Sequence, residues 1–181
     1  MKADQRFDVR VATVVDIPCI EQLIVVSARK LSRGYYDDQQ IEAAIAHIFG
    51  VDTTLISDGT YFVAETENRI VGCGGWSQRR KLFGGDQYAA RDAPFSEPCM
   101  DPARIRAFFV HPGAARTGVG CVLLARCENE ARARGHRSAE LMSTLPGVDF
   151  YRACGYEAEP ARTFTIGEKV AINFVPMRKT L

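Results

Sequence analysis

The hydrophobic pattern of the chain switches repeatedly between a period of two and a helical period. Residues 7–13, FDVRVAT, alternate apolar and polar side chains and predict a first strand. Apolar residues then recur at helical spacing from Asp16, the expected N-cap, as far as Gly34, and a second helix is expected over 39–49. The segments GTYFVAE (59–65) and RIVGCGGWSQ (69–78) predict an antiparallel hairpin.

The second half of the chain continues this alternation after a long irregular segment. Residues 81–102 carry a glycine pair and three prolines, so we expect a loop that is mobile or is ordered by substrate or a partner subunit. The remaining segments predict a strand, a helix, a strand, a short helix and two strands, at 103–111, 118–135, 138–144, 147–155, 162–167 and 171–179. Within the long helix, the expected buried stripe is Val119, Leu123, Cys127 and Ala131. This order predicts one mixed α/β domain over 7–181, with a central sheet of about six or seven strands and helices on both faces.

Composition limits the classes of function. The chain has 181 residues, a length sufficient for one hydrophobic core, and 46% of them are apolar and 25% charged. Its net charge of +1 gives no reason to expect nucleic acid as a partner. No apolar run reaches the ~18 residues of a membrane span, and no signal-peptide core is present, so we expect a cytoplasmic protein without a membrane partner. The six cysteines form no CxxC pair and the three histidines are scattered. We therefore expect no metal site, and interpret the cysteines as small core residues in a reducing compartment.

A glycine-rich turn joins the strand at 103–111 to the long helix, in the stretch VHPGAARTGVGCVLL (110–124). It lacks the GxxxxGK[ST] pattern of a Walker loop, and Leu123 stands where a dinucleotide fingerprint needs its third glycine. The unpaired N–H groups of a helix start suit a phosphate, and Gly118 and Gly120 would let the backbone approach one without a Cβ in the way. Arg116 and Thr117 can add a charge and a hydroxyl donor. An ordinary helix start with turn glycines is the alternative.

The stretches IRAFFVHPGAARTGVGCVLL (105–124) and FYRACGY (150–156) resemble the GCN5-related N-acetyltransferase (GNAT) superfamily. The resemblance follows nearly the whole chain and implies a GNAT-like sheet that splays between its fourth and fifth strands. It implies acetyl-CoA as cosubstrate, with the pantetheine arm along the backbone of Phe108, Phe109 and Val110. The pyrophosphate would lie on the turn formed by Ala115, Arg116, Thr117, Gly118, Val119, Gly120 and Cys121. The sequence departs from the family pattern at Ala115, where the family has Gln or Arg, and in TLPGVD (144–149), which lacks a common asparagine.

The resemblance also implies catalytic roles. Tyr151 matches the tyrosine that acts as general acid and protonates the coenzyme A thiolate, whereas packing of the short helix is its alternative role. No general base stands out, since Glu65, Glu140 and Asp149 are equally consistent with solvated carboxylates, and the amine can lose its proton to water. His111 is interpreted as part of the turn after the strand.

We expect the acceptor site to be built from the RGYYDD loop (33–38), the end of the 69–78 strand and the long loop. Its candidate substrate-binding residues are Tyr35, Tyr36, Trp76 and Arg106. The aromatic side chains could hold an amine-bearing substrate, Asp37 and Asp38 could attract its charge, and Arg106 would favour an anionic group. The sequence therefore predicts an N-acetyltransferase that acetylates a primary amine of a small molecule or peptide by direct attack in a ternary complex. A non-catalytic acetyl-CoA-binding sensor or interaction module is the alternative, and a homodimer is left open.

Overall fold

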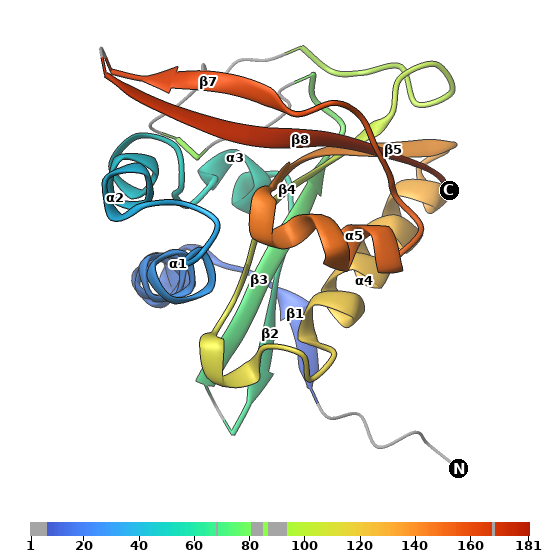
Figure 1. Ribbon diagram of the computed structural model, residues 1–181. Helices are drawn as coiled ribbons and strands as arrows, with labels where there is room; N and C mark the ends of the chain where they lie inside the picture. Colours follow the sequence, from blue (N-terminus) through green and yellow to red (C-terminus); the bar gives the residue numbers. More distant parts are fainter. Residues whose placement is uncertain (1–6, 68, 81–84, 87–93, 168) are drawn as a thin grey trace.

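One twisted sheet forms the centre of the protein, with helices on both faces (Figure 1). The computed structural model describes residues 7–67, 69–80, 85–86, 94–167 and 169–181. The strands are β1 (Asp8–Val11), β2 (Tyr61–Thr66), β3 (Arg69–Ser77), β4 (Ala103–Val110), β5 (Ser138–Thr144), β6 (Glu157–Ala158), β7 (Arg162–Ile166) and β8 (Val170–Thr180). In these residues they form an eight-stranded sheet of order β1-β2-β3-β4-β5-β8-β6, with β7 paired to β8. The expected single α/β domain with a mixed sheet is confirmed, with at least one strand more than expected.

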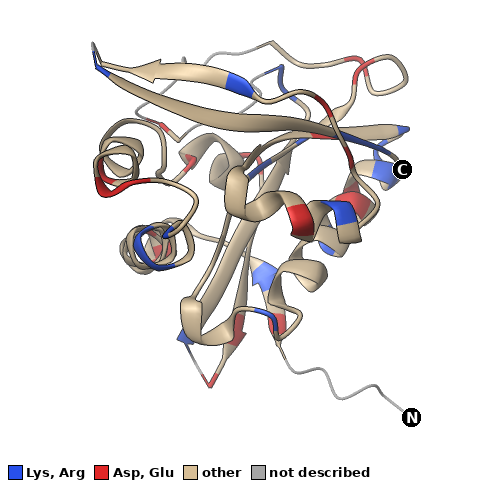
Figure 2. Cartoon of the chain, viewed as in Figure 1, with Lys and Arg blue, Asp and Glu red and all other residues tan. Residues whose placement is uncertain are grey.

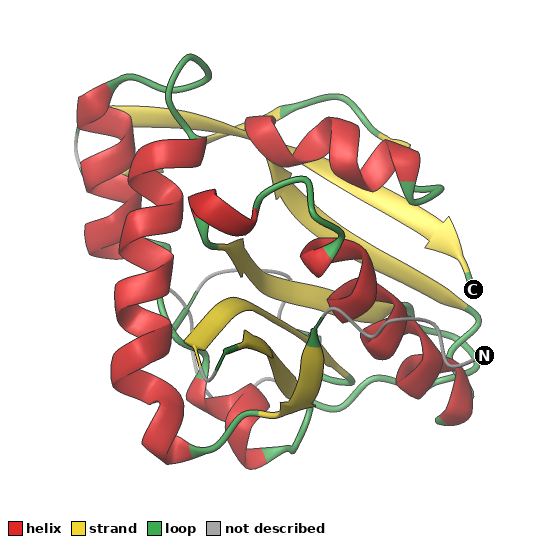
Figure 3. Cartoon of the chain, turned by 90° about the horizontal axis from the view of Figure 1, so that it is seen from below, coloured by secondary structure: helices red, strands yellow, loops and turns green. Residues whose placement is uncertain are grey.

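The helices divide into two layers, which Figures 1 and 3 show on opposite sides of the sheet. They are α1 (Ile17–Leu31), α2 (Asp38–His47), α3 (Thr53–Ser57), α4 (Val119–Ala133) and α5 (Val148–Ala153), together with the 3-10 turns η1 (Val14–Asp16), η2 (Pro112–Ala114) and η3 (Leu145–Gly147). The apolar face of α1 packs on Tyr61, Val63 and Cys73. On the opposite face, α4 packs on alternate residues of the same strands, such as Phe62 and Trp76, and α5 packs beside β5 and β6. The expected α4 stripe of Val119, Leu123, Cys127 and Ala131 is buried there.

Strands β4 and β5 run in parallel but separate early. Their only registered pairs in the described residues are Ala103 with Ala139 and Arg104 with Glu140. An ion pair between Arg104 and Glu140 lies at this last point of contact. Beyond it, β5 stays paired with β8 as far as Thr144. The splay expected between the fourth and fifth strands is therefore present, and one edge of β4 lacks a strand neighbour for most of its length.

A β-bulge interrupts β4 on its other edge. Cys73 of β3 pairs with Phe109, whereas Gly75 pairs with Arg106, so two steps along β3 correspond to three along β4. Ala107 lies within this bulge and has a φ of 56°, in the left-handed region. The extra residue turns the side chains of Arg106 and Ala107 toward the same face, because Arg106 reaches Asp52 beside α3 and Ala107 packs in the α1 cluster.

Three expectations need correction. Helix α3 and the short strand β6 were not foreseen, because elements of a few residues give no readable period. Asp16 is the N-cap residue of α1 as expected, but its carboxylate accepts hydrogen bonds from the Thr13 N–H and from Arg10 rather than from the first turn of α1. Cys19, Cys99 and Cys121 are exposed, so only Cys73 and Cys127 are fully buried core residues.

Half of the long loop, residues 81–84 and 87–93, lies outside the described residues, so its expected mobility stays a prediction. Its described part includes Gly85 and Asp86, whose N–H groups bond to the Ile48 and Val51 carbonyls at 2.8 and 3.1 Å. Both signs of charge are distributed over both helical layers (Figure 2). Among the described residues, none of the helices is sufficiently long and apolar to cross a membrane.

Candidate active site

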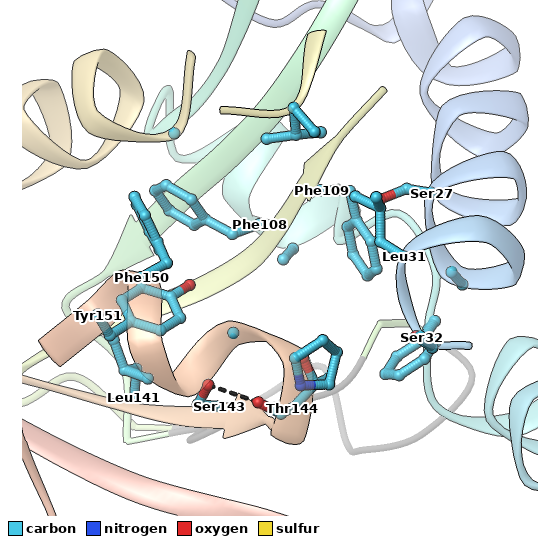
Figure 4. A pocket seen from close by; sticks show the side chains of 18 of the residues that line it. Ser27, Leu31, Ser32, Phe108, Phe109, Leu141, Ser143, Thr144, Phe150 and Tyr151 are labelled. Carbon is cyan, nitrogen blue, oxygen red and sulfur yellow. Dashed lines mark hydrogen bonds between the residues drawn. The ribbon is translucent and has the colours of Figure 1, made fainter. Parts of the chain in front are cut away.

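A cavity of ≈ 730 Å³ lies between the separated parts of β4 and β5. Its walls come from β4, the glycine-rich turn before α4, the end of β5 with η3 and α5, and one side of α1 (Figure 4). The strand separation creates this space, because the β4 edge is left uncovered where β5 turns away.

The glycine-rich turn forms the α4 end of the cavity. Ala115, Arg116, Gly118, Val119, Gly120 and Cys121 all line it. Gly118 is the N-cap of α4 with a φ of 99°, and Val122 is the first residue bonded back to it, through the Gly118 carbonyl at 3.1 Å. Helix geometry therefore leaves the N–H groups of the first turn without i−4 partners and concentrates positive potential at the cavity wall. This is the arrangement that binds a phosphate or pyrophosphate.

Two residues of the turn differ from the expectation. Thr117 is absent from the lining, and its hydroxyl donates to the Ala114 carbonyl at 2.6 Å, so that donor stabilises the turn itself. A Cβ on Gly120 would lie 3.0 Å from Cζ of Phe150, whereas a Cβ on Gly118 would meet nothing within 4 Å. The missing side chain of Gly120 therefore accommodates Phe150, and Gly118 is the position with open space beside it.

Tyr151 enters the cavity from α5. Its ring is held by edge contacts with Phe150, Tyr156 and Phe108 at centroid distances of 4.9, 5.7 and 6.4 Å. The hydroxyl points into the cavity (Figure 4) and has no hydrogen-bond partner among the described residues. Burial raises the pKa of Tyr151 above its usual value of 10. The phenol is therefore protonated at neutral pH and is a proton donor for a group placed in the cavity.

Strand β4 forms the long wall. Phe108, Phe109 and Val110 line the cavity, and the two phenylalanine rings point to opposite faces of the sheet. Phe108 faces Tyr151, and Phe109 packs against Phe49 at a centroid distance of 5.6 Å.

The four residues expected at the acceptor site have different surroundings. Tyr35 is 53% exposed and lines the cavity. Its neighbour Tyr36 is buried outside the lining, where its hydroxyl donates to the Asn173 carbonyl at 2.6 Å. Adjacent residues in this loop point in opposite directions, so Tyr36 holds the loop on β8 and is not a substrate-binding side chain.

Trp76 was also expected at the acceptor site, but it lies elsewhere. Strand alternation turns it toward α4, where it is fully buried beside His136 and its indole N–H lies 3.5 Å from a Glu130 carboxylate oxygen. It does not line the cavity.

Arg106 does line the cavity, but its charge is neutralised locally. A guanidinium nitrogen lies 2.8 Å from Asp52, and the two side chains are 1% and 0% exposed. Arg106 is therefore not the free cation that was expected to favour an anionic acceptor group.

The carboxylates considered as candidates also have different surroundings. Glu65 is bound to Arg10 at 2.6 Å and Glu140 to Arg104, so neither faces the cavity. Asp149 lines it with an 89% exposed side chain. Asp37 caps α2 by accepting the Gln40 N–H at 2.7 Å, and it does not line the cavity.

His111 and the metal-ligating residue types add no site. The His111 Nδ1 accepts the Gly113 N–H at 3.1 Å, within the turn as expected. In the described ranges no cluster of three His, Cys, Asp or Glu side chains could hold a metal ion.

The sequence missed several hydroxyl groups of the cavity wall. Ser27 comes from α1 and Ser32 from its C-cap, and Ser143 and Thr144 come from the carboxyl end of β5. The position of Ser143 and Thr144 at a strand end, next to the short helix with Tyr151, was the signal that could have found them. Ser27 sits on a helix face that otherwise predicts only core packing.

The Acetyltransferase (GNAT) domain model matches residues 57–158, which is more than half of the chain. This chain belongs to the GNAT acetyltransferase family. The match covers the hairpin β2–β3, the cavity strands β4 and β5, the glycine-rich turn and the helix with Tyr151. In a search of curated proteins, no significant match to the chain was found.

Solved structures share the fold of this GNAT protein at low sequence identity. A GCN5-related N-acetyltransferase from Rhodopseudomonas palustris is 20% identical with a TM-score of 0.73, over 100% of this chain and 99% of that one. The PaiA N-acetyltransferase from Thermoplasma acidophilum, in complex with coenzyme A, is 14% identical with a TM-score of 0.64, over 97% and 99% of the chains. A ribosomal-protein-alanine N-acetyltransferase from Brucella melitensis is 19% identical with a TM-score of 0.62, over 96% and 99%.

Proposed function

We propose that this GNAT protein transfers an acetyl group from acetyl-CoA to a primary amine of a small molecule or peptide. The observation that carries the proposal is the Tyr151 hydroxyl, which projects into the cavity between the separated strands β4 and β5. The family membership supports acetyl transfer, and the similar fold of PaiA in complex with coenzyme A supports coenzyme A as the carrier.

The glycine-rich turn would hold the coenzyme's pyrophosphate. The N-terminus of α4 supplies backbone N–H donors, the open space beside Gly118 allows close approach, and Arg116 lines the same wall. Ala115 offers no side-chain donor, so backbone groups and Arg116 would carry this contact. The uncovered edge of β4 would hold the pantetheine arm through backbone hydrogen bonds, in the manner of an added strand.

The chemistry needs a polarised thioester carbonyl, a neutral amine and a proton for the departing thiolate. Direct attack forms the amide bond and breaks the bond between carbonyl carbon and sulfur in one ternary complex. Tyr151 would donate the proton to sulfur, since its buried phenol is protonated at neutral pH. The attacking amine would lose its proton to water, because Asp149, the one acidic candidate that lines the cavity among the described residues, is highly exposed.

The test is release of free thiol from acetyl-CoA against a broad panel of primary amines, with product identified by mass. Binding is measured separately, as the rise in melting temperature with acetyl-CoA. Turnover with at least one amine supports the proposal. Binding without turnover across the panel would favour a coenzyme-sensing module, and the absence of binding by folded protein would contradict both functions.

A further inference from the structure

The bulge in β4 places a strained peptide at the cavity wall. Ala107 has a Cβ and a φ of 56°, a conformation that L-residues other than glycine rarely adopt. Such a backbone persists only where surrounding contacts hold it in place. Ala107 also lines the cavity, so the groups that hold it lie directly behind the site.

Two buried side chains hold the Ala107 carbonyl oxygen from the α1 face. The Tyr61 hydroxyl lies 3.2 Å from this oxygen and 3.3 Å from the Cys73 Sγ, which itself lies 3.8 Å from the oxygen. Both side chains are fully buried. Burial raises the pKa of the Tyr61 phenol and raises that of the Cys73 thiol to about 12, so both groups keep their protons and can donate.

Two consecutive glycines on β3 make room for this arrangement. A Cβ on Gly75 would lie 2.8 Å from the Tyr61 ring, so only glycine lets Tyr61 of β2 reach across β3 to β4. A Cβ on Gly74 would lie 2.5 Å from the Phe108 ring on the opposite face. The GG pair therefore allows Tyr61 and Phe108 to enclose the bulge from both faces of the sheet.

The orientation of the carbonyl fixes the orientation of the next N–H. The described peptide bonds are trans, and the C=O and N–H of a trans peptide point in opposite directions. Since the Ala107 C=O points toward Tyr61 and Cys73 of β2 and β3, the Phe108 N–H points away from these strands. Phe108 has no registered partner on β3 or on β5, and it lines the cavity.

We propose that Tyr61 is a positioning residue, which with Cys73 holds the Ala107–Phe108 peptide so that the Phe108 N–H is a donor to the thioester carbonyl. This rests on the proposed acetyl transfer. Tyr61 itself lies behind β4 and does not line the cavity. The Tyr61 hydroxyl therefore acts only by fixing the backbone. A hydrogen-bond donor stabilises the charge that develops on a carbonyl oxygen most effectively when its position is fixed in advance.

The experiment compares Tyr61→Phe with the wild type. The probes are coenzyme A, acetyl-CoA and acetyl-CoA labelled with carbon-13 at the carbonyl. We expect unchanged affinity for coenzyme A and a fall of about tenfold in kcat, because one transition-state donor is misplaced rather than removed. The turnover assay uses an amine from the panel or, failing that, acetyl-CoA hydrolysis. The infrared band of the bound carbonyl should lie below its solution position in the wild type and move back toward it in Tyr61→Phe.

The matched control is Tyr156→Phe, which also removes one buried hydrogen bond, from the Tyr156 hydroxyl to Glu128 at 3.1 Å, but leaves the Ala107 carbonyl and its two donors untouched. It should leave the carbonyl band unchanged. If Tyr61→Phe does not fold, Cys73→Ala removes the second donor and should move the band in the same direction by less. An unchanged band and kcat in a folded Tyr61→Phe overturn the positioning role while leaving acetyl transfer intact. Failure of the wild type to bind acetyl-CoA overturns the proposed function as well.

Discussion

The Tyr36 hydroxyl accepts a hydrogen bond from the Leu145 N–H at 2.9 Å, across 109 positions of sequence. The same hydroxyl donates to the Asn173 carbonyl at 2.6 Å. Leu145 begins the η3 turn that leads directly into α5 and Tyr151. One side chain from the α1–α2 connection therefore fixes both β8 and the segment that carries the proposed general acid.

Tyr36→Phe should lower the free energy of unfolding by about 1–3 kcal/mol, because it removes two part-buried hydrogen bonds made by a buried side chain. Urea unfolding measures the change. The matched control is Tyr35→Phe, which alters an exposed neighbour and should change stability by less than about 0.5 kcal/mol. Equal effects at the two positions would show that the Tyr36 bonds contribute nothing specific.

Tyr151→Phe should leave acetyl-CoA affinity nearly unchanged, because the ring contacts with Phe150, Tyr156 and Phe108 remain. Turnover should fall by roughly 10², the usual size of general-acid catalysis, which corresponds to about 2.7 kcal/mol. Calorimetric binding and thiol release measure the two quantities separately. Wild-type turnover in this variant, with chemistry rate-limiting, would assign Tyr151 to packing alone.

The pH profile of the wild type should extend further into alkali than a free phenol allows. Burial raises the pKa of Tyr151 above 10, and the protonated phenol is the active form, so activity falls only as the pH passes this raised pKa. A turnover profile measured up to the limit of folding tests this, with Tyr151→Phe as the reference that lacks the alkaline limb. A loss of wild-type activity centred near pH 10 or below, absent from Tyr151→Phe, would contradict the raised pKa.

Gly120→Val should destabilise the protein and abolish the rise in melting temperature with acetyl-CoA, because the new Cβ lies 3.0 Å from Phe150 and displaces α5. The combination with Phe150→Ala isolates the cause. If the clash with Phe150 is responsible, the double variant should be more stable than the sum of the two single effects predicts, by about 1 kcal/mol or more. Additive effects in thermal and urea unfolding would place the damage elsewhere.

The Asp16→Asn variant should lose less stability in acid than the wild type does. The Arg10 guanidinium, with the Thr13 N–H and hydroxyl, lowers the pKa of Asp16 from 3.8 to about 2. Because the folded-state pKa is the lower one, the carboxylate contributes stability above about pH 4, and this is lost as the pH falls toward 2. The free energy of unfolding should therefore fall less steeply over this range in Asp16→Asn.

The sequence determined the elements whose period is long enough to read. The α1 and α4 stripes, the β2–β3 hairpin and β4 were predicted because a buried face repeats its spacing over several turns or residues. The glycine-rich turn was also local, since the end of β4, the turn with its left-handed Gly118 and the start of α4 all lie within residues 110–119. Tyr151 was identified as a candidate by its place in the short stretch FYRACGY (150–156), through the resemblance to the GNAT family.

Only the tertiary structure decided which side chains face the cavity. Tyr35 and Tyr36 are adjacent and chemically alike, yet the long-range bonds to Leu145 and Asn173 bury one of them. Strand alternation shows that Trp76 and Gly75 face opposite sides, but not which side holds the cavity. The side depends on where β5 leaves β4 and on the extra residue of the bulge at Ala107. Both are fixed by contacts between distant strands, such as Tyr61 with the Ala107 carbonyl, which no local pattern of apolar and polar residues contains.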